Sequence, residues 1–125
     1  MHKNRTIIEV VLFFYVKGRE IMQITSRQEG QVLIFTLVGE MDHHNLIDLS
    51  SRTDPIIKSV RPPIVILDMS GVPFCDSSGI AAVLGRYKIV RTWGGKVMLH
   101  GLSPQVRKVL NLGGIFNLIK EVRAS

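Results

Sequence analysis

The sequence predicts an α/β layer structure formed by a single domain. Runs rich in β-branched residues alternate along the chain with stretches whose apolar residues recur at helical spacing. Breaker pairs separate these segments at Pro62-Pro63, Gly94-Gly95 and Gly113-Gly114. The chain has 125 residues, of which 46% are hydrophobic and 21% charged. It can therefore bury the core of one compact domain and leaves no room for a second.

Two strands open the predicted domain. Residues 21–28 form a short strand, and Gln31 to Val38 (QVLIFTLV) form a second strand that ends at Gly39. The second run is rich in β-branched and aromatic residues, which pack well on a pleated, partly buried surface. These two segments supply the first strands of the α/β structure.

A helix is predicted from Asp42 to Val60, where a polar start is followed by apolar residues at helical spacing. Pro55 lies inside this stretch. Proline cannot donate a backbone amide, and its ring clashes with the preceding turn. We therefore expect this helix to be kinked or to restart near Thr53 and Asp54.

The next strand, Ile64 to Met69 (IVILDM), follows directly after the Pro62-Pro63 break. It is nearly continuous in apolar residues, which is typical of a strand covered on both faces. We expect it at the centre of the sheet.

An amphipathic helix follows and runs to about Thr92. Its apolar stripe recurs at i, i+3, i+4 and i+7 and consists of Ile80, Val83, Leu84 and Tyr87. Arg86, Lys88 and Arg91 fall largely off this stripe, which predicts that they lie on the polar face.

The last third continues the alternation. Lys96 to His100 forms another short strand, and Ser103-Pro104 opens a further helix with proline in its first turn. Gly113-Gly114 closes this helix before Ile115 to Val122.

Residues 1–20 stand apart from this pattern. Lys3 and Arg5 precede the apolar run Ile7 to Val16, but Glu9 interrupts the run and no small-residue cleavage site follows. Two interpretations stay open: an added edge strand, or an upstream extension of a functional domain that starts near Met22. No segment has the roughly 18 to 20 apolar residues that a membrane span requires.

The formal charge of +6 is concentrated in the C-terminal third, where residues 84–125 carry eight basic groups and one acidic group. The sequence contains no helix-turn-helix and no aromatic-interleaved basic pattern with which to bind bases. We therefore expect a protein partner and no direct binding of nucleic acid. The single cysteine, Cys75, agrees with a reducing cytoplasm.

Three enzyme or metal motifs are absent or incomplete. His43 and His44 are adjacent, so on a helix their side chains diverge and cannot hold one metal ion. Gly94-Gly95-Lys96 precedes a strand and lacks the upstream glycine of a phosphate-binding loop. The sequence around Ser77, DSSG, is not the GxSxG of a serine hydrolase. We expect no enzymatic activity, no cofactor and no metal.

The candidate site is the start of the helix at Asp76-Ser77-Ser78. A helix N-terminus has unpaired amides and favours an anion. Asp76 or Ser77 could simply cap the helix, with Gly79 allowing close packing, or a serine could be modified there. The two interpretations are compatible. Cys75 is expected to be a small, buried packing residue.

Four segments in order resemble the STAS domain of bacterial anti-sigma factor antagonists, and most resemble the sporulation members that act on an anti-sigma F factor. The similarity extends over about 22–122. The segments are GEMDHHN (39–45), DSSG followed by LGRYK (76–88), WGGKVML (93–99) and LSPQVRKVLNLGGIFNLI (102–119).

The resemblance implies a small mixed β-sheet with helices packed on one side, formed by residues 21–125. It also implies a cytoplasmic switch protein. The unphosphorylated form would bind an anti-sigma factor that is itself a serine kinase, and so release the sigma factor. Phosphorylation of the serine directly after the motif aspartate, here Ser77, would end that binding, and a PP2C-type phosphatase would restore it.

If the strands that precede Asp42 and Ser77 are neighbours, both loops lie on one face. The candidate partner contacts are Asp42, His43, Asp76, Ser77, Ser78 and Arg86. An alternative function is a STAS module that is never phosphorylated and belongs to a transporter or lipid-trafficking complex. The sequence leaves the sigma factor pathway, sporulation or general stress, open.

Overall fold

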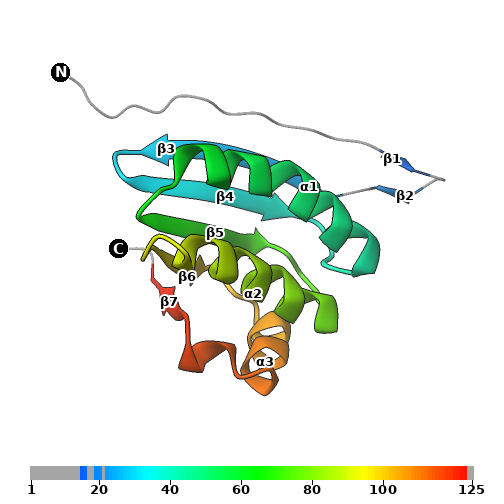
Figure 1. The fold of residues 1–125 in the computed structure, drawn as a ribbon. Helices are drawn as coiled ribbons and strands as arrows, with labels where there is room; N and C mark the ends of the chain where they lie inside the picture. The colour runs from blue at the N-terminus through cyan, green and yellow to red at the C-terminus, as the bar shows by residue number, and fades with distance from the viewer. Residues whose placement is uncertain (1–14, 17–18, 21, 124–125) are drawn as a thin grey trace.

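The computed structural model describes residues 15–16, 19–20 and 22–123. A sheet of five strands forms the body of the fold, with the order β3-β4-β5-β6-β7. The strands are β3 (Gln23–Glu29), β4 (Val32–Val38), β5 (Ile64–Gly71), β6 (Lys96–His100) and β7 (Lys120–Val122). β3 is antiparallel to β4, and the other neighbouring pairs are parallel, so the sheet is mixed. β5 lies at its centre, as the apolar run predicted (Figure 1).

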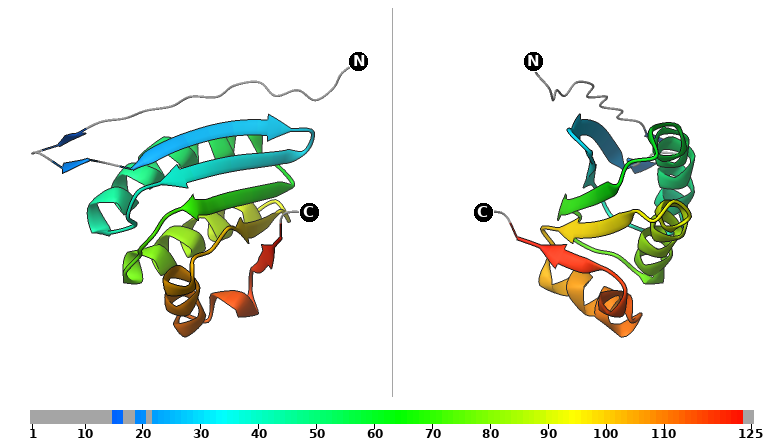
Figure 2. Two further views of the ribbon diagram at one scale, coloured as in Figure 1. Left: turned by 180° about the vertical axis from the view of Figure 1, so that it is seen from behind. Right: turned by 60° about the vertical axis from the view of Figure 1, so that its left-hand side comes forward.

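Helices cover one face of this sheet. α1 (His43–Val60) and α2 (Ser77–Arg91) lie side by side on that face, as the right-hand view of Figure 2 shows. α3 (Pro104–Leu112) packs against α2 and is followed by the short 3₁₀ helix η1 (Ile115–Asn117). The predicted α/β class, with a small mixed sheet and helices on one side, is confirmed.

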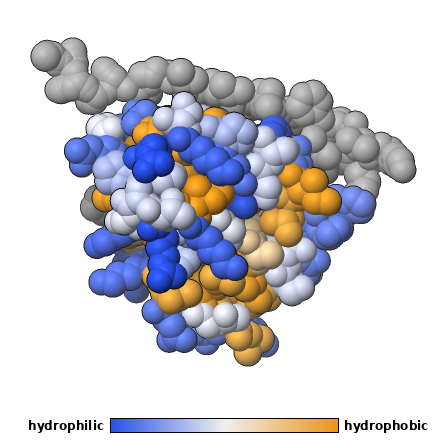
Figure 3. Space-filling model, in the orientation of Figure 1, coloured by the Kyte–Doolittle hydropathy of each residue, from blue (hydrophilic) through white to orange (hydrophobic). Residues whose placement is uncertain are grey.

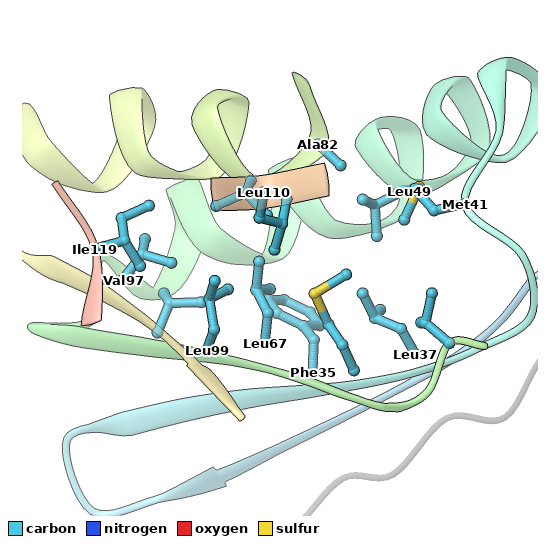
Figure 4. Close-up of a cluster of buried hydrophobic side chains, with 14 of the residues drawn as sticks. Phe35, Leu37, Met41, Leu49, Leu67, Ala82, Val97, Leu99, Leu110 and Ile119 are labelled. Carbon is cyan, nitrogen blue, oxygen red and sulfur yellow. The ribbon is translucent and has the colours of Figure 1, made fainter. Parts of the chain in front are cut away.

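The core lies between the sheet and the helices. Phe35, Leu67 and Leu99 are direct neighbours on three adjacent strands, and each is at most 1% exposed. Leu49 from α1 and Leu110 from α3 reach the same layer from the helical side (Figure 4). Alternate residues of the three strands are buried toward this layer, because successive side chains of a strand point to opposite faces.

Of the two outcomes expected at Pro55, the restart of the first helix is wrong, and the kink stays a prediction. α1 runs without interruption from His43 to Val60, with Pro55 inside it. Leu49, Thr53 and Ile57 are all buried, so one face is continuous on both sides of the proline. Proline removes only one backbone donor, and burial of this face against the core offsets that loss.

The buried face of α2 also differs from the prediction. Ile80, Leu84 and Tyr87 are only partly buried, although they pack against the core. The fully buried side of the helix instead consists of Gly79, Ala82, Val83, Arg86 and Val90. The helix is therefore rotated about its axis relative to the predicted stripe, and a charged residue faces inward.

The apolar run at residues 7–16 lies outside the described residues except for Tyr15 and Val16. These two residues form β1 (Tyr15–Val16), which pairs with β2 (Arg19–Glu20) in a two-stranded sheet of its own. Within the described part of the chain, this pair of strands does not join the five-stranded sheet.

Candidate functional site

The site is built where two parallel strands end at the same edge of the sheet. β4 and β5 are neighbours, so the loops that lead into α1 and α2 meet. Met41 and Cys75 pair through their backbones in an isolated parallel β-bridge. The Met41 amide donates to the Phe74 carbonyl (3.0 Å), and the Asp76 amide donates to the Met41 carbonyl (3.3 Å). The first turns of α1 and α2 therefore lie on one side of the molecule (Figure 1).

Asp76 caps α2. Its side chain accepts a hydrogen bond from the Ser78 amide at 2.7 Å. Ser77 is the first residue of the helix and is exposed, and its hydroxyl forms no hydrogen bond within the part of the chain that the structure describes. Of the two residues that the sequence offered as a cap, the aspartate therefore takes that role, and the serine hydroxyl is accessible.

Close packing fixes where α2 begins. A Cβ added at Gly79 would lie 2.7 Å from the Cys75 sulfur, so only glycine fits without a shift. Cys75 is fully buried, as expected of a packing residue. Burial, and then the neighbouring Asp76 carboxylate, raise the pKa of its thiol. The thiol is thus kept protonated and is poorly suited to nucleophilic chemistry.

Gln105, from the first turn of α3, holds the loop from the other side. Its Oε1 accepts from the Cys75 amide and its Nε2 donates to the Cys75 carbonyl, both at 3.0 Å. This pair of bonds satisfies both backbone groups of Cys75 directly before the helix. The sequence does not single out Gln105, since a glutamine 30 residues from its partner carries no local signal.

Asp42 and His43 occupy the matching position on α1. Asp42 caps this helix by accepting from the Asn45 amide at 2.9 Å. Asn45 is buried, accepts from the Met22 amide (3.3 Å) and donates to the Glu40 carbonyl (2.7 Å). The exposed rings of His43 and His44 meet edge to face, with centroids 6.1 Å apart.

Arg86, the remaining predicted contact residue, does not lie with the others. Its side chain is buried between α1 and α2, where its Nε is 3.1 Å from Asp54 Oδ1. Burial lowers the pKa of the guanidinium, and Asp54 opposes that effect. A partner could not reach Arg86 without separating the two helices, so its position indicates a link between α1 and α2.

Phe74 is a further exposed residue of this edge, and it is not among the predicted contact residues. It directly precedes Cys75 in the loop and is 43% exposed. A large aromatic residue between a strand and a helix, next to Pro73, is the signal that could have identified it. Aromatic residues are enriched at the centres of protein interfaces.

The described residues contain no cluster of histidine, cysteine or acidic side chains that could hold a metal ion. No helix among them is both long and apolar enough to cross a membrane. What the edge offers is a free hydroxyl at a helix N-terminus, flanked by a carboxylate and an exposed aromatic ring. That arrangement suits binding of a protein partner and modification of the serine hydroxyl.

The chain belongs to the STAS domain family, which matches residues 23–125. Its curated relatives include the anti-sigma F factor antagonist of Paenibacillus polymyxa, with 32% identity over 98 residues, covering 78% of this chain and 84% of the relative. The unphosphorylated form of the anti-sigma factor antagonist SpoIIAA has a similar structure, with a TM-score of 0.71 and 26% identity, covering 82% of this chain and 88% of SpoIIAA. The predicted family is thereby confirmed.

Similarity also extends to part of the anion transporter SLC26A9. The structure of SLC26A9 matches with a TM-score of 0.58 and 26% identity, covering 70% of this chain and 16% of SLC26A9. The match is to a small part of a much longer chain. The anti-sigma factor antagonists, in contrast, match over most of their own length.

Proposed function

We propose that this protein is an anti-sigma factor antagonist that switches between partners through phosphorylation of Ser77. In the unphosphorylated form it binds a cytoplasmic anti-sigma factor serine kinase and releases the sigma factor. Phosphorylation by that kinase ends the complex, and a PP2C-type phosphatase restores it. The observation that carries the proposal is the exposed Ser77 hydroxyl, which forms no hydrogen bond with the described residues, directly after the capping Asp76.

The proposed contact surface consists of the starts of α1 and α2 and the loop that joins β5 to α2. Five of the residues that the sequence singled out lie there, together with Phe74, and Arg86 is left out because it is buried. The members of this surface are Asp42, His43, Phe74, Asp76, Ser77 and Ser78. Phe74 would supply apolar contact area, and the two capping aspartates supply negative charge.

A phosphate on Ser77 would act mainly on the complex. It adds a charge of about −1.5 to −2, beside the Asp76 carboxylate, and an interface that covered it would lose several kcal/mol of binding energy. In the free domain the same group faces water at the positive end of α2, where an anion is tolerated. The fold should therefore persist while the complex dissociates.

Phosphorylation can be tested directly. We expect the purified protein, incubated with its anti-sigma factor kinase and ATP, to gain one phosphate, which fragmentation mass spectrometry assigns to Ser77. Ser77→Ala should abolish the modification. Ser78→Ala is the matched control, because this neighbour lies on the same turn, and it should retain it. A phosphate on Ser78, or on both serines, would contradict the assignment.

The alternative, a module of a transporter that is never phosphorylated, predicts a different outcome of the same experiment. The similarity to SLC26A9 is the observation in its favour. In that case the kinase would leave Ser77 unmodified, and the protein would not bind an anti-sigma factor in a titration.

A further inference from the structure

A groove lies at the opposite end of α2 from Ser77. It has a volume of about 450 Å³, which falls within the usual range of small-molecule sites. The last turns of α2 form one wall with Tyr87 and Arg91, and the first residues of β6 form another with Lys96 and Met98. Leu118 and the first residue of β7, Lys120, complete it. Helix geometry over the 15 residues of α2 separates this groove from Ser77 by about 20 Å.

Three positively charged residues line the groove. Arg91, Lys96 and Lys120 line it together, and no acidic residue does. None of the three forms an ion pair with an acidic side chain in the described ranges. Arg107, from the same basic third of the chain, is in contrast paired with Glu121 at 2.7 Å.

The C-terminus of a helix ordinarily repels anions, because its last carbonyl groups are unpaired. Here hydrogen bonds from the turn after α2 satisfy two of these carbonyl groups. The Gly94 amide donates to the Arg91 carbonyl (2.9 Å), and the Gly95 amide donates to the Val90 carbonyl (3.0 Å). The positive side chains therefore set the charge of the groove.

Apolar surface lies beside these charges. Leu118 is 54% exposed, and Met98 and Tyr87 are partly exposed in the same groove. Figure 3 shows strongly hydrophilic side chains next to apolar surface over the C-terminal end of α2, at the left of the view. An inorganic anion would leave the apolar part uncovered, and an uncharged apolar ligand would leave the cations without partners.

We propose that this groove binds a small organic anion, in which a phosphate, sulfonate or carboxylate is joined to a flat or apolar body. Lys96 and Lys120 contact the anionic group, together with Arg91. Leu118, Met98 and the Tyr87 ring contact the body. The site is distinct from the proposed phosphorylation surface and does not depend on it.

The probe for this proposal is 8-anilinonaphthalene-1-sulfonate, which joins a sulfonate to aromatic rings. We expect saturable fluorescence enhancement at low ionic strength, with amide shifts in ¹⁵N-correlated spectra confined to the residues around the groove. Lys96→Glu and Lys120→Glu should each weaken binding at least about tenfold, because they replace attraction with repulsion. Lys108→Glu, an exposed residue of α3 outside the groove, makes the same charge change and should alter affinity less than about twofold.

Several results would overturn the proposal. One is the absence of binding at millimolar probe. Another is a set of amide shifts centred on a different surface, such as that around Leu112, an exposed residue at the end of α3. A third is equal weakening of binding by Lys108→Glu. Equal affinity for the uncharged N-phenyl-1-naphthylamine would contradict the role of the cations, and equal affinity for inorganic phosphate would contradict the role of the apolar wall. Thermal melts of each variant ensure that loss of binding is not loss of fold.

Discussion

At the scale of single residues, the site divides two tasks between neighbours. Asp76 caps α2 through the Ser78 amide, so the helix start does not depend on the Ser77 hydroxyl. A hydroxyl that is not needed for the fold can be modified without loss of stability. Gly79 packs closely against Cys75 and so fixes the position of the first turn that carries Ser77.

This division leads to a prediction for Ser77→Asp. The substitution places part of a phosphate's charge at the first turn of α2, where an anion stabilises the helix by a few tenths of a kcal/mol. We expect the thermal midpoint to stay within about 2 °C of the wild type. Binding to the anti-sigma factor should weaken at least about tenfold, which corresponds to roughly 1.4 kcal/mol.

Calorimetric titration with the partner and a thermal melt together decide this prediction. Ser77→Asn is the matched control, since it has nearly the same size and no charge. Undiminished affinity of Ser77→Asp would refute the electrostatic switch. A collapsed melt would instead mean that Ser77 is chiefly structural.

At the scale of elements, α2 connects three features of the molecule. Its first turn presents Ser77, its last turn lines the basic groove with Arg91, and its middle holds Arg86 against α1. The Arg86 side chain is 5% exposed, whereas that of its partner Asp54 is 22% exposed. Loss of the carboxylate would therefore leave a buried charge without a partner, whereas loss of the guanidinium would leave a carboxylate that water still partly solvates.

This asymmetry predicts unequal effects of two substitutions. Asp54→Asn leaves a buried positive charge without its partner and should lower the free energy of unfolding by about 2–4 kcal/mol. Arg86→Met keeps most of the buried volume and leaves Asp54 partly in water, so it should cost less, about 0–2 kcal/mol. Urea denaturation of both variants measures the difference. Equal losses of unfolding free energy, or a larger loss for Arg86→Met, would show that the unequal burial of the two charges does not determine the cost of breaking this ion pair.

Most elements could be predicted from the sequence because their signals are local. The apolar run at 64–69 predicted the central strand, and Ser103-Pro104 predicted the start of α3, which the Ser103 side chain caps. Arg86 falls largely off the apolar stripe of Ile80, Val83, Leu84 and Tyr87, so the sequence places it on the polar face, where a charged residue is ordinarily found. Within the described part of the chain, its acidic partner is Asp54, which lies 32 residues away on another helix and makes its burial tolerable.

The same reason explains what else was missed. The unbroken α1 depends on packing of Ile57 beyond Pro55, and the fixed loop at Cys75 depends on Gln105 from α3. The short β7 exists only because β6 lies beside it, since three residues carry no pattern of their own. Tertiary contacts between distant segments decide each of these cases.

At the scale of the whole molecule, the parallel strands separate two surfaces. The C-terminal edge of β4 and β5 carries Ser77 and the capping aspartates, whereas the N-terminal edge of β6 and β7 carries Lys96 and Lys120. The net charge of +6 is therefore not spread evenly. The edge with Asp42 and Asp76 faces the proposed protein partner, whereas Arg91, Lys96 and Lys120 lie around the groove at the other end.

This distribution predicts how the protein behaves with DNA. The basic residues of 84–125 are spread over α2, α3, β6 and β7, and one of them, Arg86, is buried, so they form no single helix that could enter a groove. We expect no sequence-specific binding at physiological salt. Any weak retention at about 50 mM salt should fall steeply by about 200 mM, because it reflects only counterion release.

The double variant Lys96→Glu, Lys120→Glu should lose that retention already at low salt. Fluorescence anisotropy with two duplexes of unrelated sequence measures both effects, and a salt-resistant preference for one duplex would show that the basic surface recognises DNA after all.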